Sequence, residues 1–250
     1  MDILTQQENG VLGIMLNRPQ QRNALTGTMY DAMTRALDHA EHCSDVHVVL
    51  FGSSGGTFCA GNDVADFVNA PPLDHDSPVV QFLQRMSTAQ KPLIAAVRGP
   101  AVGIGTTLLL HCDLVYATDS ASFCLPFVRL GLCAEAGSSL LLPQLAGYQR
   151  AAEKLLLGEP FDVREAVAMG LVNRVVAEFD LDTFVRVQAA KLAALPPESV
   201  RISKALMKQA NAQQTQRQIE LEGEQFRRLL KSTEAQDALR TFLGKKRPQA

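Results

Sequence analysis

The sequence predicts an α/β fold, because β-type runs alternate with helical segments along its first half. Val11–Leu16 and Val46–Phe51 are short, mainly apolar runs that are typical of strands. Between them, Thr26–Cys43 has helical spacing, and its apolar face is formed by Met29, Met33, Leu37 and Ala40. A strand, a helix and a second strand in this order indicate an α/β core.

The alternation continues after Asn69–Pro78, whose Pro, Asp and Asn content predicts a loop. The elements expected beyond it are a helix over Val79–Ala89, a strand over Ile94–Val97, a helix over Gly103–Leu110 and a strand over Leu114–Ala117. From Pro196 onward the pattern is almost entirely helical. There, the polar stretch Gln213–Lys231 surrounds four apolar residues, as in an amphipathic helix that covers a core: Ile219, Leu221, Phe226 and Leu229.

Composition excludes several classes of protein. With 250 residues the chain is long enough to bury a substantial core, and a net charge of −2 gives no electrostatic footprint for nucleic acid. No apolar run approaches the roughly 20 residues of a membrane span. Met1–Leu4 carries no basic region ahead of an apolar segment, so we expect no secretory signal and a cytoplasmic location.

The cysteines and histidines indicate neither a disulfide framework nor a metal site. The five cysteines are an odd number without paired spacing: Cys43, Cys59, Cys112, Cys124 and Cys133. We expect them to be small buried side chains, with Cys59 close to a ligand because of the turn that contains it. The five histidines lack ligand spacing, and we assign no role to them: His39, His42, His47, His75 and His111.

Two glycine-containing turns follow β-type runs, and they are the most informative feature of the chain. Phe58–Val64 contains Gly61, and Gly99–Gly105 contains three glycines. Glycine lets backbone N–H groups face a ligand without a Cβ in the way. Two such turns can direct two N–H groups at one oxygen, as an oxyanion hole requires.

These turns, with the segments around them, resemble the enoyl-CoA hydratase/isomerase (crotonase) family. The other matching segments are Asn17-Arg18-Pro19, Arg22–Leu25, Lys91–Val97, His111–Leu114, Phe123–Gly131, Ala166–Val176 and Phe242–Pro248, in the family's order. The resemblance implies a spiral of ββα units over residues 1–195 and a helical trimerisation region over residues 196–250. It also implies an oxyanion hole formed by the amides of Asn62 and Ile104.

The resemblance also indicates which carboxylates of this chain could act as a general base. At the positions where the family's hydratases carry two glutamates, this chain has Thr107 and Phe127. Neither can act as a general base toward water, which disfavours hydration. Glu135 lies instead among Leu, Cys, Ala and Gly in Leu130–Ser139, where burial would raise its pKa and make it a better base. Taken alone, such a glutamate more often places its charge at a helix N-terminus.

The segment around Glu135 is similar to that of the peroxisomal-type Δ3,Δ2-enoyl-CoA isomerases, with Pro126-Phe127, Leu130-Gly131 and Glu135–Ser139 matching. The resemblance therefore implies an isomerase that shifts a double bond of enoyl-CoA from Δ3 to Δ2, with Glu135 as its base. The residues expected to bind the CoA part of the substrate are Arg22, Ala24, Ala60, Val64, Phe242 and Lys245. No separate cofactor is expected. The resemblance further implies a homotrimer or a dimer of trimers.

Three points stay open at the level of sequence. Gly103-x-Gly105 is part of a dinucleotide-binding pattern, but Leu108 fills its last position, which argues against such a site. A first alternative is another acyl-CoA reaction of the family, hydration included. A second alternative is a non-catalytic acyl-CoA-binding subunit, and whether Glu135 points into the acyl pocket discriminates between these possibilities.

Overall fold

A computed structural model describes residues 1–69 and 76–245 of the chain. Its main sheet has six strands in the order β1-β2-β3-β4-β6-β9. Their bounds are Ile3–Glu8, Val11–Leu16, Val48–Ser53, Leu93–Val97, Leu114–Thr118 and Arg174–Val176. Strands β1 and β2 pair antiparallel, and every later pair of neighbours in this sheet is parallel. Parallel neighbours need crossover connections, which the helices between them provide.

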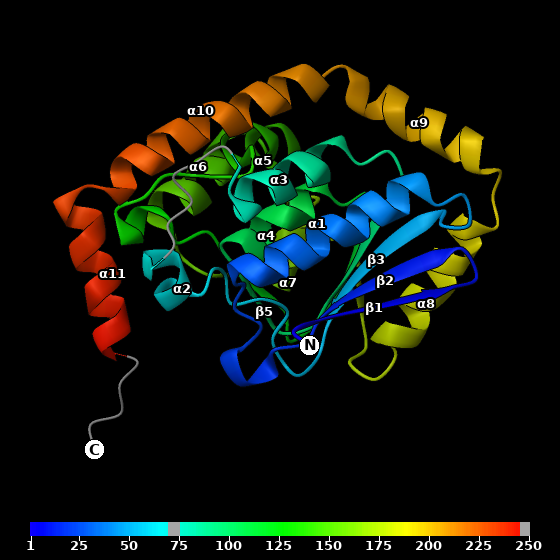
Figure 1. Ribbon diagram of the computed structural model, residues 1–250, viewed down its shortest axis with the longest axis horizontal. Coiled ribbons are helices and arrows are strands. Elements are labelled where there is room, and N and C mark those ends of the chain that lie inside the picture. The colour runs from blue at the N-terminus through cyan, green and yellow to red at the C-terminus, as the bar shows by residue number, and fades with distance from the viewer. Residues whose placement is uncertain (70–75, 246–250) are drawn as a thin grey trace.

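The main sheet separates two apolar layers. In β3, Val49 and Phe51 face one layer, whereas Val48 and Leu50 face the other, because successive side chains of a strand point to opposite sides. Helices α1 (Gly27–His42) and α3 (Pro78–Thr88) pack in the first, larger layer, and α8 (Leu181–Ala193) covers the second. Figure 1 shows α1 and α8 on opposite sides of β1 to β3. The candidate site lies in the first layer.

Helix α1 packs in the core and places Tyr30 beside the first turn. Thr26 caps its N-terminus, where the side chain accepts a hydrogen bond from the Met29 amide. The helix then buries the expected apolar face, and Tyr30 packs against Phe82 of α3 with 5.4 Å between ring centroids. This packing fixes Tyr30 in the interior beside the first turn.

A second, smaller sheet and short helices follow β4. The sheet contains β5 (Pro100–Val102), β7 (Ser122–Cys124) and β8 (Phe161–Asp162). The helices of this region are α4 (Ile104–Thr107), η2 (Leu108–His111), η3 (Val128–Leu130), α5 (Ser138–Ala146), α6 (Tyr148–Leu157) and α7 (Val163–Ala168). The short helix α2 (Val64–Asn69) follows the first turn. The second turn runs through β5 into α4, and the first turn leads into α2.

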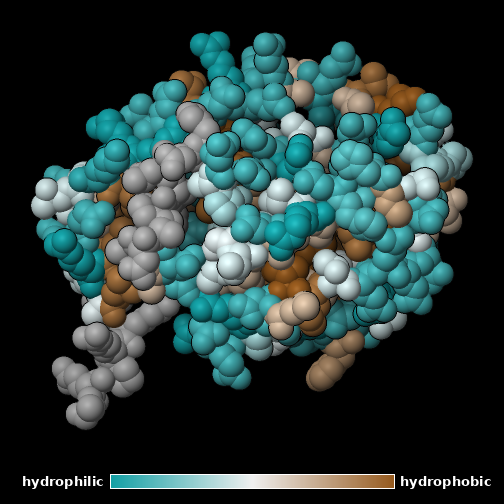
Figure 2. All heavy atoms as spheres, viewed as in Figure 1, coloured by the Kyte–Doolittle hydropathy of each residue, from teal (hydrophilic) through white to brown (hydrophobic). Residues whose placement is uncertain are grey.

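Three helices form the C-terminal region, as the sequence predicts. They are α9 (Pro197–Gln209), α10 (Ala212–Leu230) and α11 (Thr233–Lys245), and Figure 1 shows them running along the outside of the molecule. Helix α10 packs against α3 and α5, while α11 contacts η3 and α2. Figure 2 shows a mainly hydrophilic face with an apolar area over α9, where Ile202, Leu206 and Met207 are exposed.

Most expected elements are present, with informative differences. The strand expected from Val46 begins at Val48, because the Val46 amide instead closes the end of α1 by donating to Cys43. The helix expected over Gly103–Leu110 is divided into α4 and η2. The polar edge strand β1 was not expected, because only its first residue is buried. Residues 70–75 of the expected loop lie outside the described part of the chain.

Within residues 1–69 and 76–245, none of the helices combines the length and hydropathy that a membrane crossing requires.

Candidate active site

The first turn lies beside the segment that ends in Leu25. The Leu25 amide donates to Gly61 O at 2.8 Å, and the Asp63 amide donates to Leu25 O at 2.8 Å. In such a parallel bridge the residue between the two bonded groups points its own N–H the other way. The amide of Asn62 therefore faces away from Leu25, and it has no acceptor among the described residues.

The second turn is hydrogen-bonded to the first. The Cys59 amide donates to Pro100 O at 3.1 Å, and the Val102 amide donates to Cys59 O at 2.8 Å. Gly103 then adopts a φ of 56°, which favours glycine, and Ile104 begins α4. As the first residue of that helix, Ile104 has an amide without an intrahelical acceptor, and none is found elsewhere in the described chain.

Glycines allow the two turns to touch. A Cβ at Gly61 would lie 3.1 Å from Val102 O, and one at Gly103 would lie 4.0 Å from the Gly61 Cα. Asn62 and Ile104 each directly follow one of these glycines. The structure thus brings to neighbouring turns two amides that have no acceptor among the described residues.

Glu135 lies in the interior next to the second turn. The residue is 7% exposed, and Thr107 of α4 donates a hydrogen bond from Oγ1 to Glu135 Oε1 at 3.2 Å. Burial raises the pKa of Glu135 to about 7; the Thr107 hydrogen bond opposes the rise, and the charge of Glu222 adds to it. A carboxyl with this pKa is poised to accept and return a proton near neutral pH.

The backbone that follows Glu135 is held by a histidine. Ala136 has a φ of 59°, and His111 Nε2 donates to Ala136 O at 2.8 Å. Burial lowers the pKa of His111 to about 4, so its ring is neutral at pH 7. The sequence pattern assigned no role to His111, and its partner is a backbone carbonyl of a distant segment.

Two further groups near the first turn are buried and protonated. Tyr30 donates a hydrogen bond from its hydroxyl to Asn62 Oδ1, and burial, followed by the charge of Glu135, raises the pKa of Tyr30. The sequence did not predict this contact, because Tyr30 lies beside Met29 and Met33 in a helix whose apolar face we expected only to pack in the core. Burial raises the pKa of Cys59 to about 12, so its thiol is not a nucleophile at neutral pH.

Thr107 and Phe127, the positions where the resemblance leads us to expect the two glutamates of a hydratase, both lie near the second turn. Thr107 contacts Glu135, and Phe127 is buried with its Cε1 3.8 Å from where a Cβ of Gly103 would be. Neither position supplies a carboxylate. Glu135 is the carboxylate that contacts Thr107.

Of the residues expected to bind CoA, four gather at the first turn. The carbonyl of exposed Arg22 accepts a hydrogen bond from the Ala60 amide at 3.0 Å, and Ala24 O accepts one from Arg18 at 3.0 Å. Val64 begins α2 directly after the turn. Phe242 and Lys245 belong to α11, but their side chains lie outside the described residues.

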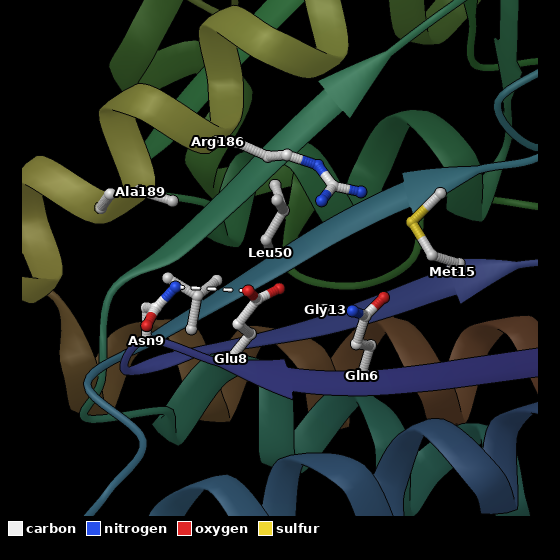
Figure 3. A pocket seen from close by; sticks show the side chains of 10 residues that line it. Gln6, Glu8, Asn9, Gly13, Met15, Leu50, Arg186 and Ala189 are labelled. Carbon is white, nitrogen blue, oxygen red and sulfur yellow. Dashed lines mark hydrogen bonds between the residues drawn. The ribbon is translucent and has the colours of Figure 1, made fainter.

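A hollow on the other face of the sheet is separate from this site. Its volume is about 310 Å³, and Figure 3 shows it between α8 and strands β1 to β3, with the Arg186 side chain extending over Leu50. None of the expected site residues lines it. In the described ranges, no three His, Cys, Asp or Glu side chains lie close enough together to bind a metal ion.

Known proteins are similar to this chain in both sequence and fold. The profile of the enoyl-CoA hydratase/isomerase family matches residues 6–250. Enoyl-CoA delta isomerase 2 of Rattus norvegicus is 37% identical over 250 residues, which are 98% of this chain and 64% of that protein. The chain thus spans a little under two thirds of the rat relative. The 1,2-epoxyphenylacetyl-CoA isomerase of Escherichia coli is 32% identical over 254 residues, covering 99% of this chain and 97% of that protein.

A crystal structure of an enoyl-CoA hydratase/isomerase from Pseudoalteromonas atlantica superimposes with a TM-score of 0.94 at 38% identity, covering 100% of both chains. This similarity confirms the expected crotonase fold with its C-terminal helical region. Because the family profile covers nearly the whole chain and the folds superimpose, the protein belongs to the enoyl-CoA hydratase/isomerase family.

Proposed function

We propose that this protein is an enzyme that shifts the double bond of an enoyl-CoA from Δ3 to Δ2. The observation that carries the proposal is the buried Glu135, whose pKa is about 7, beside Thr107 at a position where a hydratase would have a glutamate. The rat relative, whose name is that of an enoyl-CoA isomerase, supports this choice.

In the proposed reaction, one carboxylate moves one proton. Glu135 takes a proton from C2 as the C2–H bond breaks, and the electron pair spreads over C2 to C4 and the thioester carbonyl as a dienolate. The protonated Glu135 then returns the proton to C4, which leaves the double bond between C2 and C3. No water is consumed, and no second base is needed.

The amides of Asn62 and Ile104 would stabilise the dienolate by donating hydrogen bonds to its oxygen. Two observations support this role. Neither amide has an acceptor among the described residues, and the two turns that carry them are in contact. Fixed donors of this kind contribute on the order of 3 kcal/mol each to a transition state.

The CoA part would bind along the first turn. Backbone groups at Ala24, Ala60 and Val64 would contact the adenine and pantetheine, and Arg22 would contact a phosphate. Phe242 and Lys245 of α11 would complete the nucleotide site. We also propose a homotrimer or a dimer of trimers, which the exposed apolar residues of α9 support.

The experiment that tests the function compares two substrates. Purified protein should convert 3-enoyl-CoA to 2-enoyl-CoA far faster than it hydrates 2-enoyl-CoA, because positions 107 and 127 provide no carboxylate to activate water. Both rates are measured spectrophotometrically at the same pH. Faster hydration would contradict the isomerase assignment, and binding of CoA esters without turnover of either substrate would favour a non-catalytic subunit.

Thr107→Val should shift the pH dependence of isomerisation. In the wild type, kcat/KM should rise with pH and reach half its maximum near pH 7, because Glu135 must be ionised to act as base. The Thr107 hydrogen bond lowers the pKa of Glu135, so its loss should move this midpoint to higher pH.

The matched control is Thr34→Val, since the buried Thr34 hydroxyl has no hydrogen-bond partner in the described chain. It should leave the midpoint in place. An unchanged midpoint in Thr107→Val would mean that another group titrates in the pH profile.

A further inference from the structure

Helix α10 carries a buried carboxylate that reaches the segment following Glu135. Glu222 is 5% exposed, and its Oε2 accepts a hydrogen bond from the Gly137 amide at 2.6 Å. Its Oε1 accepts one from the Ser139 amide at 2.9 Å and another from the Ser139 hydroxyl. Both carboxylate oxygens of Glu222 are therefore committed to a single segment, residues 137–139.

That segment needs an external support. Ala136 and Gly137 have φ values of 59° and 74°, so two successive residues adopt the left-handed conformation before α5 begins. For Ala this conformation is unfavourable, and it persists only where its surroundings impose it. The long-range contacts that impose it here are those of His111 with Ala136 O and of Glu222 with the Gly137 amide.

We propose that Glu222 is a positioning residue for Glu135: by holding the Ala136–Gly137 turn it directs the Glu135 carboxyl toward the reacting carbons. The proposal rests on the proposed role of Glu135 as base. It gives α10 a part in the chemistry, although the helix lies on the outside of the molecule (Figure 1).

The electrostatic effect on Glu135 comes from Glu222, because the other titratable groups nearby are neutral. Four titratable groups face the same interior and are neutral at pH 7: burial raises the pKa of Tyr30, of Cys59 to about 12 and of Cys133 to about 11, and it lowers that of His111 to about 4. The positive charge of Arg228 in α10 acts on Cys133, where it lowers the pKa of the thiol and so partly opposes the effect of burial. Among the described residues, Glu222 is the acidic group whose charge raises the pKa of Glu135. Burial also raises the pKa of Glu222 itself, and the hydrogen bonds from Ser139 and Gly137 oppose that rise and favour its charged form.

The test is Glu222→Gln, measured in the 250-residue chain. A glutamine side chain offers one acceptor oxygen in place of two, so it cannot satisfy both amides. We expect kcat for 3-enoyl-CoA to fall roughly 10- to 100-fold with KM nearly unchanged, as for a displaced catalytic group. The midpoint of the pH profile should move to lower pH, because a negative charge beside Glu135 is lost.

The matched control is Glu224→Gln, which removes an exposed charge two residues along the same helix. It should change neither kcat nor the midpoint. If Glu222 serves only to stabilise the fold, Glu222→Gln will lower Tm while kcat, KM and the midpoint of the remaining folded protein stay at wild-type values. That result would overturn the proposal.

A second readout does not depend on turnover. Infrared titration follows the carboxyl band that disappears in Glu135→Gln, and its midpoint should be lower in Glu222→Gln than in the wild type. If Glu222→Gln does not fold, Ser139→Ala removes one of the three donors to Glu222 and keeps its charge. It should lower kcat several-fold without moving the midpoint, and unchanged kcat would contradict the proposal.

These readouts also separate this inference from the proposed function. A wild type that does not isomerise 3-enoyl-CoA contradicts the function, while the infrared midpoint still reports on Glu222. An active wild type whose turnover and infrared midpoint do not respond to Glu222→Gln contradicts the positioning role alone.

Discussion

Glu135→Gln should lose roughly 10²- to 10⁴-fold in kcat for 3-enoyl-CoA, the range typical of general-base catalysis. Glutamine has nearly the same size and can still accept the hydrogen bond from Thr107, but it cannot take the C2 proton as a carboxylate does. Affinity for CoA esters should change little, because the proposed contacts with CoA belong to other residues. Turnover and calorimetric binding measured on the same preparation check both expectations.

The stability of Glu135→Gln provides the control for folding. In the folded protein the pKa of Glu135 is raised from 4.5 to about 7, so the stability it contributes is present below pH 4.5 and is lost as the pH rises through 7. The variant should therefore be more stable than the wild type at pH 8, by on the order of 3 kcal/mol from a shift of this size. Retained turnover in a folded variant would assign the proton transfer to another group.

Ile104→Pro should lower kcat at least ~10²-fold, because it deletes one of the two proposed oxyanion donors. Proline is tolerated at the first position of a helix, which Ile104 occupies in α4. The residue before it is Gly103, whose φ of 56° and ψ of −120° are accessible to glycine. The substitution is therefore directed at the amide and spares the course of the backbone.

Ile104→Ala is the matched control, since it truncates the same buried side chain but keeps the N–H. It should lower the free energy of unfolding while turnover stays within a few-fold of wild type. Equal kcat values for folded Ile104→Pro and Ile104→Ala would show that the Ile104 amide does not stabilise the transition state.

The sequence carried enough local information to predict the fold class and the neighbourhood of the site. The apolar residues around Glu135 predicted its burial, and the glycines predicted two turns, which the structure places in contact. These features are readable because each depends on a few adjacent residues. The roles of Asn62, Ile104 and Glu135 in catalysis remain predictions.

The supporting contacts were not predictable in the same way, since they join segments that are far apart in the chain. Glu222 lies 85 residues from Gly137, and only the folded topology brings them together. One signal did exist: Glu222 is three residues after Ile219 and four before Phe226, which places it on the buried face of α10. Leu221, expected with the apolar residues of this helix, is 44% exposed.

The most direct test of the central claim follows a label through the reaction. 3-Enoyl-CoA carrying deuterium at C2 is isomerised in ordinary water, and NMR of the 2-enoyl-CoA formed in the first turnovers locates the deuterium. If Glu135 carries the proton within a buried site, part of the deuterium lost from C2 should appear at C4. Product that carries only solvent hydrogen at C4, even in the first turnover, would contradict transfer by a single carboxylate.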